Sequence, residues 1–329
     1  MGHPLSKLKK RSRHKSRFNR NTGSTISVSS RSSADESDGI TSPKDNLFRF
    51  YENRRFYGDS ICMPNDDEEC DRLHLQHFLY KHVWHGNFFS PIEKILNNST
   101  DEKTVHVLDV GCAAASWVFD MATTFPSANF TGVDISPHQP FQIKPFNVTF
   151  VTANVMDGLP FQNNSFDFIH QRLLFSSYKT SQWNFVINEL VRILKPGGYL
   201  ELVELDPMVK DVGPATLRVF EAACQLLINY DTDRYTCYKL KKYLMEQGQL
   251  ENISYEERQL RYGNNYGRLG QVAVEHHLAL MQSLKPELLK IICIPSDEYD
   301  ELIKNAENEL FELNSYSVIT RAWARKKFH

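Results

Sequence analysis

Apolar and polar positions repeat along the middle of the chain in an order typical of alternating strands and helices. Short apolar runs predict buried strands at 105–110, 130–134, 148–151, 166–169 and 199–204. Helical spacing of apolar residues predicts helices over 115–125 and 183–194, and Pro196-Gly197-Gly198 ends the second. Because strands that alternate with helices form parallel sheets, the pattern predicts a Rossmann-like, doubly wound, mostly parallel α/β fold.

The pattern changes on both sides of this core. Residues 46–100 read as a helical segment leading into the fold, with apolar and aromatic residues at helical spacing after an acidic run. Beyond the core, one or two helices are expected over 214–248. Further elements are predicted as helices over 268–283 and 297–313 and strands over 253–261 and 316–323. We expect the last strand to run antiparallel to the others.

Charge is distributed unevenly between the first residues and the rest of the chain. The net charge is −2, yet residues 1–20 hold eight Lys or Arg and no acid, which leaves 30 basic against 40 acidic residues. Residues 1–45 are also rich in Ser and poor in large apolar residues, so this tail is expected to be disordered. An acidic body attracts a phosphate backbone poorly, so nucleic acid is disfavoured as a substrate.

The basic tail suggests an address or a contact surface rather than a folded part. Lys7–Arg20 resembles a nuclear localisation patch, a contact for anionic membrane or a site for protein partners. Met1-Gly2 with Ser6 fits a loose myristoylation pattern, but His3 gives it a poor context, so we rank it below nuclear targeting. A tail that is solvated and has no partner is the alternative reading.

Cysteine usage favours an intracellular protein, cytoplasmic or nuclear. The six cysteines form no CxxC pair, and the chain begins with no apolar signal segment, so we expect reduced thiols. No apolar run approaches the roughly 20 residues that span a bilayer. A cluster within one predicted helix, Cys70, His74, His77, His82 and His85, lacks the CxxC or HExxH framing of a zinc site. Histidines packed on a helix face are therefore expected, and no metal.

Candidate ligand-binding residues follow three neighbouring strands at their carboxyl ends, where open α/β sheets bind ligands. The first strand runs into a loop of small residues, 111–116, and the helix start after it offers free N–H groups to a carboxylate. Asp134 closes the second strand, where an acid can accept hydrogen bonds from both hydroxyls of a ribose. Asn154, after the third strand, could read an adenine edge beside a free backbone N–H, although Asp157 is a nearby alternative.

These residues lie in four motifs that resemble those of class I methyltransferases. Residues 107–117 resemble motif I, and Gly132-Val133-Asp134-Ile135-Ser136 resembles motif II. Residues 159–168 and 192–198 resemble the runs that precede the fourth and fifth strands. Residues 64–77, 144–148 and 170–172 are also similar to the LaeA-like group of fungal methyltransferases.

The resemblance implies S-adenosylmethionine as cofactor and a role for each matching residue. Asp109 and Gly111, with Ala113 in the same loop, would hold its amino-acid end. Asp134, followed by Ile135, would bind the ribose, and Asn154 with the Val155 amide would contact the adenine. His170 and Gln171 would lie near the transferring methyl. Residues 46–100 would cap the pocket of a domain spanning 101–329, with its core at 101–206 and a helical insertion and C-terminal strands at 207–329.

Methyl transfer is an in-line displacement that needs alignment and exclusion of water more than acid–base chemistry. The candidates for activating a nucleophile are therefore only two, His170 and Glu204, both expected at strand ends facing the cleft. His170 could equally be a hydrogen-bonded residue at a strand end. No Asn/Asp-Pro-Pro-aromatic motif follows the fourth strand, which disfavours methylation of nucleic-acid bases. The acceptor would be a small molecule or a protein side chain.

One departure from the motif supports a rival reading. Ala113 and Ala115 replace two glycines of the loop, and a Cβ at φ > 0 costs about 1–2 kcal/mol, or roughly 5- to 30-fold in affinity. The chain could therefore be an inactive, methyltransferase-like regulator or scaffold in the nucleus. An NAD-dependent reductase is disfavoured because the loop lacks GxGxxG.

Overall fold

The structure is a computed structural model that describes residues 48–51, 54–58, 63–100, 102–137, 139–140 and 142–328. The basic tail predicted over residues 1–45 lies outside the described residues, as does Cys62. Cys112, Cys224, Cys237 and Cys293 are free thiols. No helix in the described part of the chain is long and apolar enough to cross a membrane.

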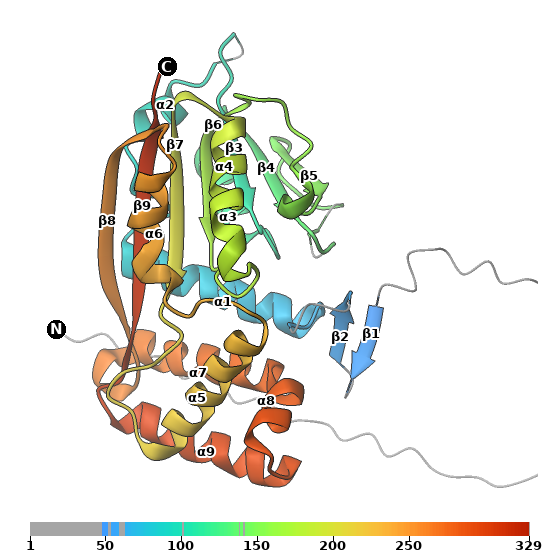
Figure 1. Cartoon of the computed structure of the whole chain (residues 1–329), viewed down its shortest axis with the longest axis vertical. Coiled ribbons are helices and arrows are strands. Elements are labelled where there is room, and N and C mark those ends of the chain that lie inside the picture. Colours follow the sequence, from blue (N-terminus) through green and yellow to red (C-terminus); the bar gives the residue numbers. More distant parts are fainter. Residues whose placement is uncertain are drawn as a thin grey trace, which may run out of the picture. The chain divides into compact units, whose positions relative to one another are not determined.

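A seven-stranded sheet organises the described chain in the order β5-β4-β3-β6-β7-β9-β8 (Figure 1). Its strands are β3 (His106–Val110), β4 (Asn129–Asp134), β5 (Val148–Thr152), β6 (Phe166–Arg172), β7 (Leu194–Leu205), β8 (Leu250–Arg261) and β9 (Tyr316–Lys326). β3 to β7 pair in parallel, whereas β9 runs antiparallel between β7 and β8. This confirms the predicted mostly parallel fold with an antiparallel C-terminal strand.

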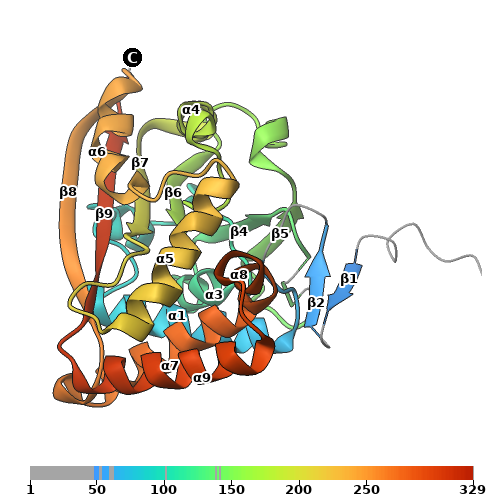
Figure 2. The same cartoon turned by 60° about the horizontal axis from the view of Figure 1, so that its bottom comes forward.

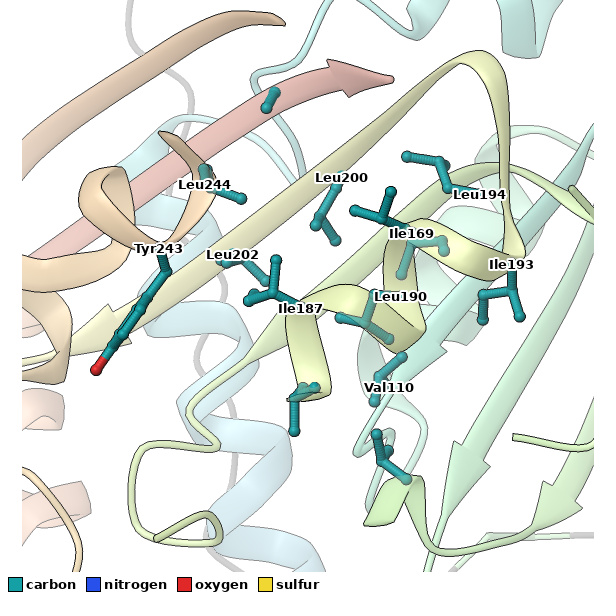
Figure 3. Close-up of a cluster of buried hydrophobic side chains, with 14 of the residues drawn as sticks. Val110, Ile169, Ile187, Leu190, Ile193, Leu194, Leu200, Leu202, Tyr243 and Leu244 are labelled. Atoms are coloured by element: carbon teal, nitrogen blue, oxygen red, sulfur yellow. The ribbon is translucent and has the colours of Figure 1, made fainter. Parts of the chain in front are cut away.

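Helices cover both faces of the sheet because successive side chains of its strands point to opposite faces. On one face, Leu108, Val110 and Ile169 pack against α4 (Trp183–Ile193) and α6 (Thr236–Glu246) in a continuous apolar cluster (Figure 3). On the other face, Val107 and Phe168 pack against α3 (Ser116–Thr124) and α2 (Glu93–Asn97). Short 3₁₀ turns interrupt the connections at η2 (Val155–Asp157), η3 (Thr180–Gln182) and η4 (Asn264–Tyr266).

A helical layer lies beyond the carboxyl ends of the parallel strands. The long helix α1 (Asp67–Trp84) packs its Leu79, Tyr80 and Trp84 into one apolar cluster with Val203 and Leu205, at the end of β7. The same cluster includes residues of α5 (Pro214–Asn229), α7 (Gly267–Ser283), α8 (Lys285–Ile292) and α9 (Ser296–Glu312), the layer that comes forward in Figure 2. The segments before and after the predicted core therefore pack together at the carboxyl ends of the parallel strands, where open α/β sheets bind ligands.

A small antiparallel hairpin precedes α1 and is attached to its first turn. It consists of β1 (Phe48–Tyr51) and β2 (Arg54–Tyr57). Arg54 at the start of β2 makes a two-pronged ion pair with Asp66, at 2.7 and 3.0 Å. Asp66 also caps α1 by accepting from the backbone N–H of Glu69 at 3.0 Å. One carboxylate thus satisfies a free helix donor and holds the hairpin in place.

Candidate cofactor site

The loop after β3 has a backbone that favours glycine at three alternate positions. Gly111, Ala113 and Ala115 have φ of +68°, +45° and +63°. A Cβ at Gly111 would also lie 2.6 Å from the Leu174 side chain, so this position needs glycine for space as well. Ala113 and Ala115 therefore occupy the strained left-handed region that the sequence raised as a possibility.

The same loop leaves backbone donors open at the start of α3. The residue before the helix, Ala115, contributes no side-chain cap, and the first backbone bond within the helix comes from Phe119. Helix starts of this kind carry free N–H groups and the positive end of the helix dipole. The loop is therefore suited to a carboxylate.

Asp134 at the end of β4 is held by two backbone donors. Its Oδ2 accepts from Ala113 N–H and its Oδ1 from Ser136 N–H, both at 2.9 Å. Burial raises the pKa of Asp134 above its usual value, although these hydrogen bonds oppose the shift. Asn65, just before α1, donates to the Ser136 hydroxyl, while Ile135 keeps 44% of its surface exposed. A carboxylate oxygen accepts more than one hydrogen bond, so Asp134 retains capacity for hydroxyl donors.

Asn154 and Val155 lie in the turn after β5, beside Asp134 on the neighbouring strand. The Asn154 side chain caps η2 by accepting from Met156 N–H at 3.0 Å, which uses its carbonyl oxygen. Val155 is buried, and Asp157 is exposed. Contact of Asn154 and Val155 with an adenine stays a prediction.

His170 and Asp109 form a buried pair between adjacent strands. His170 Nδ1 lies 2.7 Å from Asp109 Oδ1, and the two residues are direct partners in the β3–β6 register. The imidazole also stacks on Trp117, with 4.1 Å between ring centroids and an interplanar angle of 3°. Both members of the pair are almost fully buried. His170 is therefore a hydrogen-bonded residue at a strand end, one of the two roles that the sequence allowed. Its ring packs against α3.

Gln171 points to the opposite face of β6 from His170, because neighbouring strand residues alternate. It is fully buried, and its carbonyl oxygen accepts a long hydrogen bond from the Tyr178 hydroxyl at 3.4 Å. Its Nε2 has no hydrogen-bond partner among the described residues. A buried amide donor without a partner costs about 1–3 kcal/mol. This atom is therefore a place where a ligand oxygen would be stabilising.

Glu204, near the end of β7, lies beneath the loop that follows β6. Its carboxyl group is fully buried and accepts from the backbone N–H groups of Leu174, at 3.0 Å, and Phe175, at 3.2 Å. Burial raises the pKa of Glu204 to about 8, against the effect of these two bonds. The carboxyl group holds the loop whose Leu174 side chain lies over Gly111.

The histidines of α1 make separate contacts. His74 Nδ1 lies 2.6 Å from the Ser116 hydroxyl, and His77 Nε2 lies 3.0 Å from Asp120 on α3, while His82 meets His85 edge-on. Within the described ranges, no three His, Cys, Asp or Glu side chains are grouped to hold a metal ion. The contacts of His74 and His77 tie α1 to α3, the helix that follows the loop after β3.

Arg172, the residue after Gln171, was given no role by the sequence. It ends β6 and points to α1, where its Nη2 lies 3.5 Å from His77 Nδ1. The sequence signal was a cation directly after two candidate residues at a strand end. That signal is weak, because an arginine at the end of a strand usually reaches solvent.

The residues present fit S-adenosylmethionine by the chemistry of their free groups. The uncapped start of α3 suits the carboxylate of its amino-acid part, and Asp134 suits ribose hydroxyls. The unpartnered Nε2 of Gln171 adds a buried donor. The structure brings Asp109, Gly111, Ala113 and Asp134 together, whereas Glu204 lies two strands from β3 and His170 and Gln171 face opposite ways.

Comparison with known proteins gives a family and several relatives. The family described as "Methyltransferase domain" matches residues 107–198. N-methyltransferase verN of Clonostachys rogersoniana is 34% identical over 149 residues, 44% of this chain and 50% of the relative. N-methyltransferase gliN of Aspergillus fumigatus is 22% identical over 273 residues, covering 79% and 94%. The secondary metabolism regulator laeA of Coprinopsis cinerea is 29% identical over 288 residues, covering 80% and 68%.

The matches cover different fractions of this chain and of its relatives. The chain spans about half the length of several curated relatives that it matches, at 50%, 46% and 56%. Among solved structures, Haemonchus contortus phosphoethanolamine N-methyltransferase 2 in complex with S-adenosyl-L-methionine is 21% identical. That match covers 77% of this chain and 57% of the other, with a TM-score of 0.44.

Proposed function

We propose that the chain is a class I, S-adenosylmethionine-dependent methyltransferase that transfers a methyl group to a nitrogen acceptor, a proposal supported by the match of residues 107–198 to the methyltransferase domain family. The observation that carries the proposal is the linked pair of strand ends, in which Asp134 holds the loop after β3 through Ala113. A nitrogen acceptor is supported by the several relatives named N-methyltransferases.

The chain's own residues would bind and orient the cofactor. We propose that Asp134 accepts from the ribose hydroxyls, with Ile135 beside it, and that Asn154 and the Val155 amide contact the adenine. The loop of Gly111 and Ala113 would hold the amino-acid end near Asp109, and the free N–H groups at the start of α3 would donate to its carboxylate. The bound cofactor supplies an activated methyl on sulfur, so the protein needs to align the acceptor and exclude water. Helix α1 and the layer of α5 and α7–α9 would provide that enclosure.

A base is needed only if the acceptor nitrogen carries a proton that it must lose. With a pKa of about 8, the Glu204 carboxyl is mainly protonated at pH 7 and is a poor proton acceptor by itself. An ammonium group nearby would lower that pKa and allow the carboxylate to take the proton. Glu204 is thus suited to a cationic amine, whereas His170 is already bonded to Asp109.

The proposal is tested by formation of S-adenosylhomocysteine. The purified chain is incubated with S-adenosylmethionine and a panel of primary and secondary amines, and S-adenosylhomocysteine is measured by mass spectrometry. Product above the level of Asp134→Ala supports the proposal. Cofactor binding without product from any amine would contradict it.

A regulatory protein without turnover is the second candidate. It is favoured by the strained Ala113 and Ala115 and by the similarity to proteins named secondary metabolism regulators. If the protein has no turnover, the double variant Ala113→Gly/Ala115→Gly relieves the backbone strain but forms no more S-adenosylhomocysteine than Asp134→Ala does.

A further inference from the structure

Arg172 is a deeply placed cation at the carboxyl end of β6. Its guanidinium lies over the Tyr80 ring of α1, 5.6 Å from the centroid, and its Nη2 approaches His77 Nδ1 at 3.5 Å. Protein surrounds it closely enough that burial lowers its pKa below the usual arginine value. The side chain still keeps part of its surface accessible.

The neighbour that Arg172 contacts most directly is uncharged. His77 Nε2 lies 3.0 Å from Asp120, a carboxylate that only accepts, so Nε2 carries the proton. Nδ1 is then the acceptor that faces Arg172. Burial lowers the pKa of His77, which keeps the ring neutral at pH 7. The negative charge of Asp120 is itself shared with Lys81, at 2.6 Å.

Arg172 differs from the buried Arg72 and Arg321 in having no acidic partner among the described residues. Arg72 pairs with Glu69 at 2.5 Å, and Arg321 has Glu201 at 3.9 Å. Among the described residues, no carboxylate lies within 4.0 Å of the Arg172 nitrogens, and Asp109, which acts on it at longer range, is bonded to His170. A buried charge without a partner is strongly unfavourable. A guanidinium in this state has four or more N–H donors available for an anion.

We propose that Arg172 binds a carboxylate at the reaction centre, an inference that rests on the proposed function. The planar guanidinium matches a carboxylate in a two-pronged pair. Its place on β6, next to β3 and Asp109, puts that carboxylate beside the loop of Gly111 and Ala113. The group belongs either to the amino-acid part of the cofactor or to an acidic methyl acceptor, and the two sources are separable.

The test uses calorimetric titration of the full chain and of Arg172→Gln. S-adenosylhomocysteine has the amino-acid carboxylate, and 5′-methylthioadenosine lacks it. If the cofactor is the source, Arg172→Gln weakens S-adenosylhomocysteine binding roughly 10- to 100-fold and leaves 5′-methylthioadenosine unchanged. Arg172→Lys, which keeps the charge without the fork, recovers part of the loss.

If the acceptor is the source, both nucleosides bind Arg172→Gln as they bind the wild type. Propionate then stabilises the wild-type protein saturated with S-adenosylhomocysteine in a thermal-shift titration, and this shift is lost in Arg172→Gln. Arg258→Gln is the matched control, because Arg258 is a half-buried arginine with its own partner, Glu256, at 2.8 Å. It should behave as the wild type in both titrations.

Two results contradict the proposal and are distinguishable. If Arg172→Gln equals the wild type with S-adenosylhomocysteine and with propionate, the carboxylate assignment is wrong while the cofactor site stands. If the wild type binds neither nucleoside, the proposed function fails, and the assignment fails with it.

Discussion

The backbone N–H of Ala113 donates to Oδ2 of Asp134 across 2.9 Å, which joins the loop after β3 to the end of β4. The bond needs the left-handed backbone that Ala113 adopts at φ +45°. A residue with a Cβ is therefore strained at the point where the two strands of the candidate site meet.

Ala113→Gly should stabilise the protein. Removing the Cβ relieves about 1–2 kcal/mol of strain, and the added chain entropy of glycine offsets about 0.5–1 kcal/mol. We expect the free energy of unfolding, measured by urea denaturation, to rise by about 0.5–1 kcal/mol. The neighbouring Ala114 has ordinary backbone angles and is buried, so Ala114→Gly should destabilise. Equal losses in both variants would show that Ala113 is not strained.

The Asp109–His170 pair predicts a coupled loss of stability. His170→Phe keeps a ring against Trp117 but leaves the buried Asp109 carboxylate without its partner. We expect a loss of about 3 kcal/mol in the free energy of unfolding. Adding Asp109→Asn removes the unpaired charge and should restore part of that loss. Additive effects of the two substitutions in urea denaturation would mean that the pair is not coupled.

Glu204 predicts a pH dependence of stability. Its pKa is raised to about 8 in the folded protein, so the folded state binds this proton more tightly than the unfolded state. The contribution to stability is therefore complete at low pH and falls as pH rises toward 8. Glu204→Gln should remove that loss and gain stability relative to the wild type as pH rises toward 8.

Comparing the wild type with Glu204→Gln isolates the titration of the Glu204 carboxyl group. His277 has its pKa lowered to about 4 by burial, so it destabilises the folded protein only as pH falls below its ordinary value. It does not titrate above its ordinary value of 6.5. Parallel stability curves for the wild type and Glu204→Gln between that value and pH 8 would refute the raised pKa, because above pH 8 both folded and unfolded states have lost the proton.

Gln171 predicts a separation of stability from ligand binding. Its buried Nε2 has no partner in the described structure, and its carbonyl oxygen accepts only the long 3.4 Å bond from the Tyr178 hydroxyl, so an apolar side chain of similar size loses little. Gln171→Leu should change the free energy of unfolding by less than about 1 kcal/mol and weaken S-adenosylhomocysteine binding about tenfold. Unchanged binding in a calorimetric titration would remove Gln171 from the cofactor site.

The sequence predicted the sheet and most helices because their periodicity is strong. The strand expected at 130–134 is Asn129–Asp134, and the helix expected at 183–194 is Trp183–Ile193. The hairpin at 48–57 lies in a segment that the sequence predicted to be helical, which was wrong for these residues, and α8 was not predicted. Each has too few residues for a period to show, and α8 has only Leu288 fully buried.

The sequence predicted where the candidate site lies in the fold, but not which groups surround its residues. The strand ends placed Asp109 and Asp134 on neighbouring strands, and the β3–β4 register pairs Asp109 with Gly132, two residues before Asp134. The pairing of His170 with Asp109 depends on the β3–β6 register, which no local pattern reveals. A glutamate in a strand reads as exposed, and Glu204 is buried only because residues 174 and 175 fold over it. That Arg172 has no acidic partner among the described residues likewise depends on the position of α1, which no local pattern reveals.

Titration with S-adenosylhomocysteine tests the central claim most directly. The account predicts micromolar binding to the wild type by calorimetry, at least a tenfold loss in Asp134→Ala, and no loss in Asp297→Ala, an exposed acid in the first turn of α9. Circular dichroism of both variants checks that they are folded. Absence of heat and of any thermal shift with millimolar ligand would contradict the account.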